Sequence, residues 1–170
     1  MFSRSYGAAG TTRDDALCMK MGQQLVFGEQ IGWLDPSISQ EKVAGAFLKN
    51  TVLLRHSLRR YFYAGEMARP LKLAGAMPTV RADWQWGGED WVTTDAVLTG
   101  AWKLPKEKRL ALIYANVSDK PVTLTVRFNA RDYGIAASHI TCDTLGALPP
   151  QFERKLTFAP RTAIAWELKW

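Results

Sequence analysis

Three tryptophans lie close together in the sequence: Trp84, Trp86 and Trp91, within residues 83–91, beside three carboxylates and two glycines. If this segment is extended, Trp84 and Trp86 share one face, because successive side chains of a strand alternate. Flat aromatic rings next to acidic groups can stack on a sugar ring while the carboxylates bind its hydroxyls. The same rings can instead fill the junction between two parts of the fold. The sequence therefore indicates either a sugar-binding platform or a packed aromatic cluster.

A basic cluster is the second candidate for chemistry, and it is formed by Arg55, His56, Arg59 and Arg60. On a helix, Arg55 and Arg59 are four residues apart and form one ridge. Such a ridge can bind an anion or nucleic acid. No base-stacking or groove-reading motif accompanies it, so we favour a solvated or salt-bridged face and expect no nucleic-acid partner.

The residues that commonly hold metals and cofactors form no recognisable pattern. Cys18 and Cys142 lie far apart, and His56 and His139 are isolated. The sequence has no glycine-rich phosphate loop, nucleophile elbow or zinc-protease motif. We therefore expect no metal and no cofactor. Two buried free thiols are favoured over a single long-range disulfide.

Composition indicates an ordinary globular protein. Of the 170 residues, 47% are hydrophobic and 22% are charged, which excludes disordered, collagen-like and disulfide-scaffold classes. Lys and Arg number 22 against 16 Asp and Glu, giving a net charge of +6. No apolar run approaches the roughly 18 residues that a membrane span needs, so we expect no membrane contact. Residues 1–10 lack the apolar core of a secretory signal.

Two helices are predicted in the first part of the chain. Thr12 and Asp15 resemble a capping box, and Gly28 is a plausible end for the helix that follows. The face of this helix carries Leu17, Met21 and Leu25. A second, continuous helix is expected from about Asp35 to Gly65, with one apolar stripe of Val43, Phe47, Leu54, Leu58 and Tyr61. The two helices cannot bury both stripes against each other alone.

Short alternating runs after Met77 predict antiparallel strands. Residues 110–115 and 122–128 alternate, and the polar turn 118–120 between them predicts a hairpin. The last strand, 164–170, places Trp166 and Trp170 in the core. Further strands are expected around 79–84, 94–103, 138–145 and 152–159. The predicted fold class is α+β: an N-terminal helical segment, 1–77, followed by an antiparallel β-sandwich of about seven or eight strands, 78–170.

The order of these parts resembles the end of a (β/α)8-barrel glycoside hydrolase. The residues that carry the resemblance are Gly22–Trp33, Leu53–Phe62 and the strand segments 97–102, 110–117 and 122–128. In such enzymes the last barrel helices lead into a small β-sandwich. A whole barrel takes about 250 residues, and far fewer precede the sandwich here. The resemblance therefore implies a C-terminal fragment, or a stand-alone descendant, of such an enzyme.

The resemblance also suggests where substrate could be contacted. Arg4 and Tyr6 lie where the last barrel loop would form the active-site rim, unless they belong to a frayed terminus. Glycoside hydrolysis commonly needs two carboxyl groups. The available carboxylates near the helical segment are those of Asp14, Asp15, Glu29, Asp35 and Glu66. Asp14 and Asp15 are explained by the start of a helix, and Glu29 is a weak catalytic candidate that is more simply a solvated turn residue. Because no pair stands out, we expect the chain alone to be inactive.

Three functions fit these observations, and carbohydrate is the expected partner in two of them. The favoured one is the C-terminal part of a glycoside hydrolase-like protein, whose sandwich supports a carbohydrate-active barrel. The alternatives are a carbohydrate-binding module using Trp84, Trp86 and Trp91, and a non-enzymatic interaction domain. Because the helix stripes lack a barrel sheet to cover them, the helices must fold back onto the sandwich or pair with another copy. We favour self-association as a homodimer, or association with the missing barrel portion.

Overall fold

The first part of the chain folds into a layer of helices, as its periodicity predicts. The computed structural model describes residues 11–32, 36–82 and 92–170. Helix α1 spans Thr11–Val26 and completely buries Leu17, Met21 and Leu25. It ends two residues before Gly28, whose φ of 72° lies in the left-handed region that glycine adopts without strain.

The stretch between residues 36 and 64 is broken into three helices, so the prediction of one long helix is wrong. These are the 3-10 helix η1 (Pro36–Gln40), α2 (Lys42–Ser57) and α3 (Arg59–Ala64). Glu41 has an extended backbone, and Leu58, with a ψ of 4°, separates α2 from α3. In the last turn of α2, the Ser57 hydroxyl donates to the Leu54 carbonyl at 2.8 Å, a local bond that competes with helix continuation. The break allows both Leu58 and Tyr61 to be buried.

Eleven strands follow in the described part of the chain, and they confirm the α+β class with an antiparallel sandwich. More strands form than expected, because several have only two to four residues and carry no periodic pattern. They are β1 (Glu66–Ala68), β2 (Leu73–Ala74), β3 (Thr79–Ala82), β4 (Val92–Asp95), β5 (Val97–Leu104), β6 (Arg109–Asn116), β7 (Val122–Asn129), β8 (Ile140–Cys142), β9 (Gly146–Leu148), β10 (Gln151–Phe158) and β11 (Thr162–Lys169). They form a six-stranded sheet ordered β1-β5-β6-β11-β8-β9, a three-stranded sheet ordered β10-β7-β2, and a β3-β4 ribbon.

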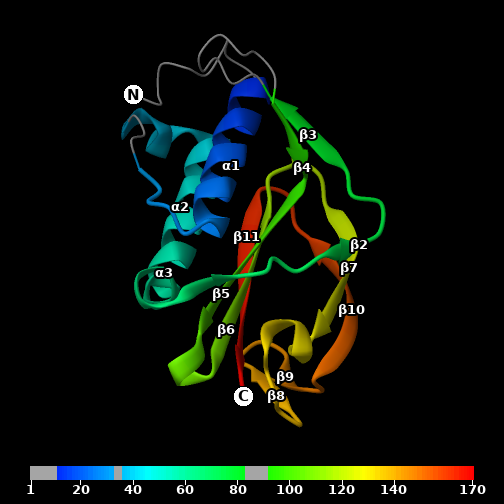
Figure 1. The fold of residues 1–170 in the computed structure, drawn as a ribbon. Coiled ribbons are helices and arrows are strands. Elements are labelled where there is room, and N and C mark those ends of the chain that lie inside the picture. The colour runs from blue at the N-terminus through cyan, green and yellow to red at the C-terminus, as the bar shows by residue number, and fades with distance from the viewer. Residues whose placement is uncertain (1–10, 33–35, 83–91) are drawn as a thin grey trace.

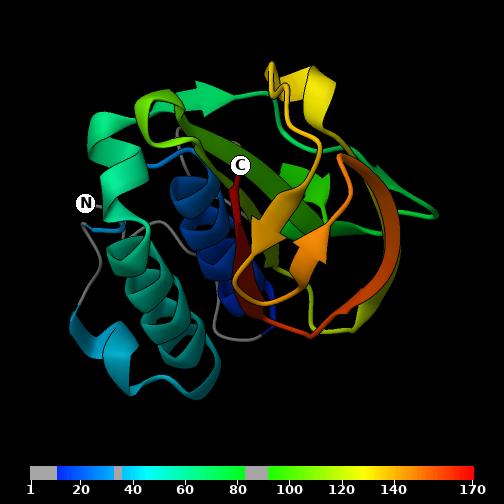
Figure 2. The same cartoon turned by 90° about the horizontal axis from the view of Figure 1, so that it is seen from below.

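The helices and the two sheets form three layers, with the six-stranded sheet in the middle (Figures 1 and 2). Strand β6 shows this most clearly, because every residue from Leu110 to Asn116 is buried. On one face of β6, the Tyr114 ring lies 5.4 Å from that of Phe158 in β10. On the other face, Ala115 is so close to Gly22 of α1 that a Cβ at residue 22 would lie 3.5 Å from it. A strand covered on both faces explains the nearly continuous apolar run.

The predicted hairpin between β6 and β7 is wrong, because these strands belong to different sheets. Asn116, fully buried, holds the chain where it crosses from one sheet to the other. Its Oδ1 accepts hydrogen bonds from the Ser118 amide at 3.0 Å and the Ser118 hydroxyl at 2.7 Å. Its Nδ2 lies 2.9–3.1 Å from the carbonyl oxygens of Lys120, Phe158 and Ala159. These hydrogen bonds stabilise an arch that connects the two sheets, and not a tight turn between neighbouring strands of one sheet.

The apolar helix stripes are covered by the six-stranded sheet. Phe47 and Tyr61 are 1% and 2% exposed. Asn50 Oδ1 accepts a hydrogen bond from the β11 amide of Ala163 at 2.7 Å, and the Tyr61 hydroxyl donates to Glu167 at 3.0 Å. The helices therefore fold back onto the sandwich, which is one of the two outcomes expected for these stripes, and the homodimer favoured from the sequence stays a prediction. No described helix is long and apolar enough to cross a membrane.

Candidate functional site

Most residues predicted to contact sugar lie outside the described residues: Arg4, Tyr6, Trp84, Trp86 and Trp91. Glu29 is described, and it is exposed in the irregular segment that follows α1. Its main-chain oxygen accepts a hydrogen bond from Arg55 Nε at 2.7 Å. Trp166 is 4% exposed, which confirms its assignment to the core. Cys18 and Cys142 are both free and buried, as predicted.

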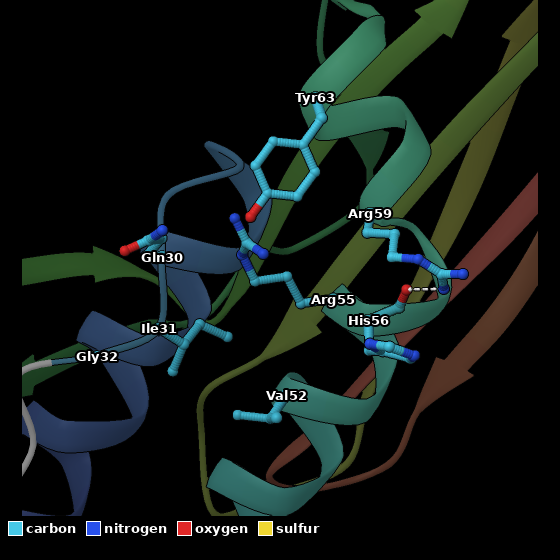
Figure 3. Close-up of a pocket in the computed structure, with 8 residues that line it drawn as sticks. All are labelled: Gln30, Ile31, Gly32, Val52, Arg55, His56, Arg59 and Tyr63. Carbon is cyan, nitrogen blue, oxygen red and sulfur yellow. Dashed lines mark hydrogen bonds between the residues drawn. The ribbon is translucent and has the colours of Figure 1, made fainter.

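A pocket of about 340 Å³ opens between the segment after α1 and the outer side of α2 and α3 (Figure 3). It contains three of the four residues of the predicted basic cluster. The lining residues are Gln30, Ile31, Gly32, Val52, Arg55, His56, Arg59 and Tyr63. We call this pocket the helix-side pocket.

Arg55 is the most firmly placed side chain of the helix-side pocket. Besides its bond to Glu29, it donates from Nη2 to the Gly28 carbonyl at 3.2 Å. Its guanidinium carbon also lies 5.3 Å from the centre of the Phe62 ring and 5.6 Å from that of Tyr63. These contacts tie the segment after α1 to the helices. Hydrogen bonding and the positive charge of Arg55 lower the pKa of the exposed Tyr63 phenol, which points toward the guanidinium in Figure 3.

The two other arginines of the basic cluster have different hydrogen-bonding partners. Arg59 Nη1 donates to the His56 carbonyl at 2.9 Å, and its side chain extends away from Tyr63 in Figure 3. Arg60 points elsewhere and pairs with Glu107 at 2.8 Å. The predicted salt-bridged face is therefore confirmed for Arg60, whereas Arg55 and Arg59 donate to main-chain oxygens.

Sequence reasoning missed the walls of the helix-side pocket. Tyr63 follows Arg55 and Arg59 at the same four-residue spacing, a signal that was present in the sequence. The break at Leu58 made its direction unpredictable. Gln30, Ile31 and Gly32 come from a segment without regular structure, so no periodicity places them.

Two carboxylates, those of Asp132 and Glu153, line another described pocket together with Phe128 and Phe152. Glu153 pairs with Arg127 at 2.9 Å, and both side chains are 62% exposed. The general acid of a glycosidase is held in apolar surroundings that exclude water, whereas Asp132 and Glu153 are both exposed to solvent. Among the described residues, no group of three metal-binding side chains gathers.

Comparison with known proteins gives matches to solved structures only. Neither a protein-family model nor a curated protein matches the chain. Similar solved structures include a candidate α-N-acetylgalactosaminidase from Bacillus halodurans, with 13% identity and a TM-score of 0.49. A GH27 β-L-arabinopyranosidase from Geobacillus stearothermophilus has 15% identity and a TM-score of 0.45, and an α-amylase from Geobacillus thermoleovorans has 11% and 0.47.

All three are glycoside hydrolases, and each match covers 92% of this chain but only 31–34% of the other. The chain thus spans about a third of the length of these enzymes. At such identities and TM-scores, activity and substrate have to be argued from the residues themselves.

Proposed function

We propose that this chain is the C-terminal part of a glycoside hydrolase-like protein, in which the sandwich and its helices support a carbohydrate-active barrel. The chain is not catalytic on its own. Its helical layer has two sides with different tasks. The inner side packs on the six-stranded sheet, and the outer side packs against the barrel.

The observation that carries this proposal is the outer side of the helical layer, where large apolar side chains are exposed. Among the described residues, six large apolar or aromatic side chains are at least 36% exposed, and four of them belong to or border the helices. These are Phe27, Val52, Leu53 and Tyr63, of which Leu53 is 60% exposed and Tyr63 is 70% exposed. We call these four residues the outer apolar face. Scattered exposed apolar residues are normal, but Val52 and Tyr63 line one pocket together with Arg55 and Arg59, and this combination is typical of a protein interface.

The absence of catalysis is supported by the carboxylates. Asp132 and Glu153 are exposed to solvent, and Glu29 is exposed and is not among the residues that line the helix-side pocket. A retaining or inverting glycosidase needs two carboxyl groups placed on either side of the scissile bond. In the proposed arrangement the barrel provides them.

Hydrolysis of a panel of aryl glycosides tests the proposal, using this chain alone and the same chain joined to the coding sequence upstream of Met1. The longer protein is expected to release the aryl group, and the chain alone is not. Turnover by the chain alone that vanishes in Glu29→Gln, and persists in the exposed control Glu66→Gln, would overturn the proposal. An upstream reading frame that encodes no barrel would also overturn it.

A further inference from the structure

The helix-side pocket concentrates positive charge without a matching acid among the residues that line it. Arg55, His56 and Arg59 line the pocket, and none of the described lining residues carries a carboxylate. Three other arginines of the described residues have acidic partners: Arg60 pairs with Glu107, Arg127 with Glu153, and Arg161 with Asp15. Arg55 and Arg59 instead donate to main-chain oxygens, so their positive charges are not neutralised by a described lining residue of the pocket.

The pocket is also built to hold its charge in place. Arg55 is fixed by two main-chain oxygens and lies beside two aromatic rings, so little side-chain entropy remains to be lost on binding. Arg59 is held to the His56 carbonyl. Arginine and tyrosine side chains held in this way are the usual anchors of protein interfaces.

From this charge and its surroundings we infer that the helix-side pocket receives a carboxylate side chain of the barrel. The acceptor is an Asp or Glu flanked by apolar residues, which contact Val52 and Tyr63 while the acid meets Arg59. This inference rests on the proposed function and names the chemistry of the docking partner. The exposed Val52 and Tyr63 side chains line the pocket beside the arginines, and such apolar surface favours a protein partner over a small anion or a nucleic acid.

A second copy of the chain fits this site poorly. A two-fold contact through the outer apolar face would bring two copies of the Arg55–Arg59 ridge together. Each copy also carries a net charge of +6. Like charges facing each other across an interface oppose association, whereas an acidic partner gains from the same field.

Zero-length crosslinking tests the inference in the intact protein, as the source cell makes it. The conservative variant R59K introduces a primary amine, which a carbodiimide joins to any carboxylate in direct contact. The matched control is R154K, which places an amine on the exposed side of β10. We expect mass spectrometry to find the amine at position 59 joined to an Asp or Glu of the barrel, and no such product from R154K.

Several results would overturn the inference. They are a crosslink to Glu29 or Asp35 of the same chain, a crosslink to a second copy, equal products from R59K and R154K, or no product in a folded R59K protein. Protection of R59K from crosslinking by a 20-nucleotide RNA would point instead to nucleic acid. If no product forms while the outer apolar face is shielded from solvent in the intact protein, the inference fails and the proposed function stands. If that face is also unshielded, both fail.

Discussion

Replacing Asn116 by alanine should lower the free energy of unfolding, because Asn116 stabilises the connection between the two sheets of the sandwich. Asn116 is fully buried where the chain passes from β6 to β7. Its side chain accepts two hydrogen bonds from Ser118 and donates to main-chain carbonyls near residues 120 and 158–159. An amide nitrogen has two hydrogens, so three nearby acceptors share two donors.

The magnitude follows from counting these bonds. Four hydrogen bonds at about 1 kcal/mol each give about 4 kcal/mol, and leaving buried groups unpaired keeps the cost at about 3–5 kcal/mol. Asn129 is a matched control, because it also ends an eight-residue strand, β7. Its side chain is partly exposed and accepts one hydrogen bond, from the Arg131 amide at 3.1 Å. Asn129→Ala should therefore cost about 1 kcal/mol.

Urea unfolding followed by tryptophan fluorescence provides the measurement. With a slope of about 2 kcal/mol/M, a loss of 4 kcal/mol moves the midpoint by about 2 M, against about 0.5 M for the control. If Asn116→Ala and Asn129→Ala agree within about 0.5 kcal/mol, a margin typical of surface substitutions, the arch does not join the sheets as described.

Two further predictions concern the contact between α1 and the rest of the fold. Gly100→Ala should destabilise the protein by about 1–3 kcal/mol, because a Cβ at residue 100 would lie 2.5 Å from the Val26 main-chain oxygen. The control Gly32→Ala should leave the free energy of unfolding unchanged in the same urea assay, because a Cβ at residue 32 would have no atom within 4 Å. Equal costs for the two would contradict this close approach. Burial raises the pKa of Cys18 from 9.0 to about 12. As the pH rises, the unfolded chain therefore loses the thiol proton before the folded protein does. Between pH 9 and pH 12 the free energy of unfolding should fall by up to about 1.4 kcal/mol per pH unit. Unfolding free energies measured from pH 8 to 11 should fall less steeply in Cys18→Ala, and parallel curves would refute the assignment.

Much of the fold follows from local patterns in the sequence. The stripe of Leu17, Met21 and Leu25 and the alternation of Val122–Phe128 predict one helix and one strand that the structure confirms. These elements are long and amphipathic, so their burial decides their conformation. The sandwich itself follows from the number and spacing of such runs.

The sequence predictions are wrong where contacts between distant parts of the chain determine the local structure. A polar turn such as Ser118–Lys120 fits a hairpin as well as an arch, and only the carbonyls of residues 158 and 159 distinguish them. Likewise, the stripe that runs through Leu58 continues across a helix break that local spacing does not reveal.

The candidate site was predicted only in part. The ridge of Arg55 and Arg59 was recognised from its spacing, but its acceptors at Gly28 and Glu29 come from an irregular segment. Conversely, Trp84, Trp86 and Trp91, for which the sequence indicates either a sugar platform or a packed aromatic cluster, lie outside the described residues, so both hypotheses stay predictions.

Hydroxyl-radical footprinting of the outer apolar face tests most directly whether this chain docks on a larger protein. The oxidation rates of Phe27, Leu53 and Tyr63 would be compared between the chain alone and the intact protein of the source cell. Ile164, which is 36% exposed on β11, serves as the internal control. Docking predicts that the three residues become several-fold less reactive in the intact protein while Ile164 is unchanged. Equal reactivity of all three in both samples would contradict a barrel packed against this face.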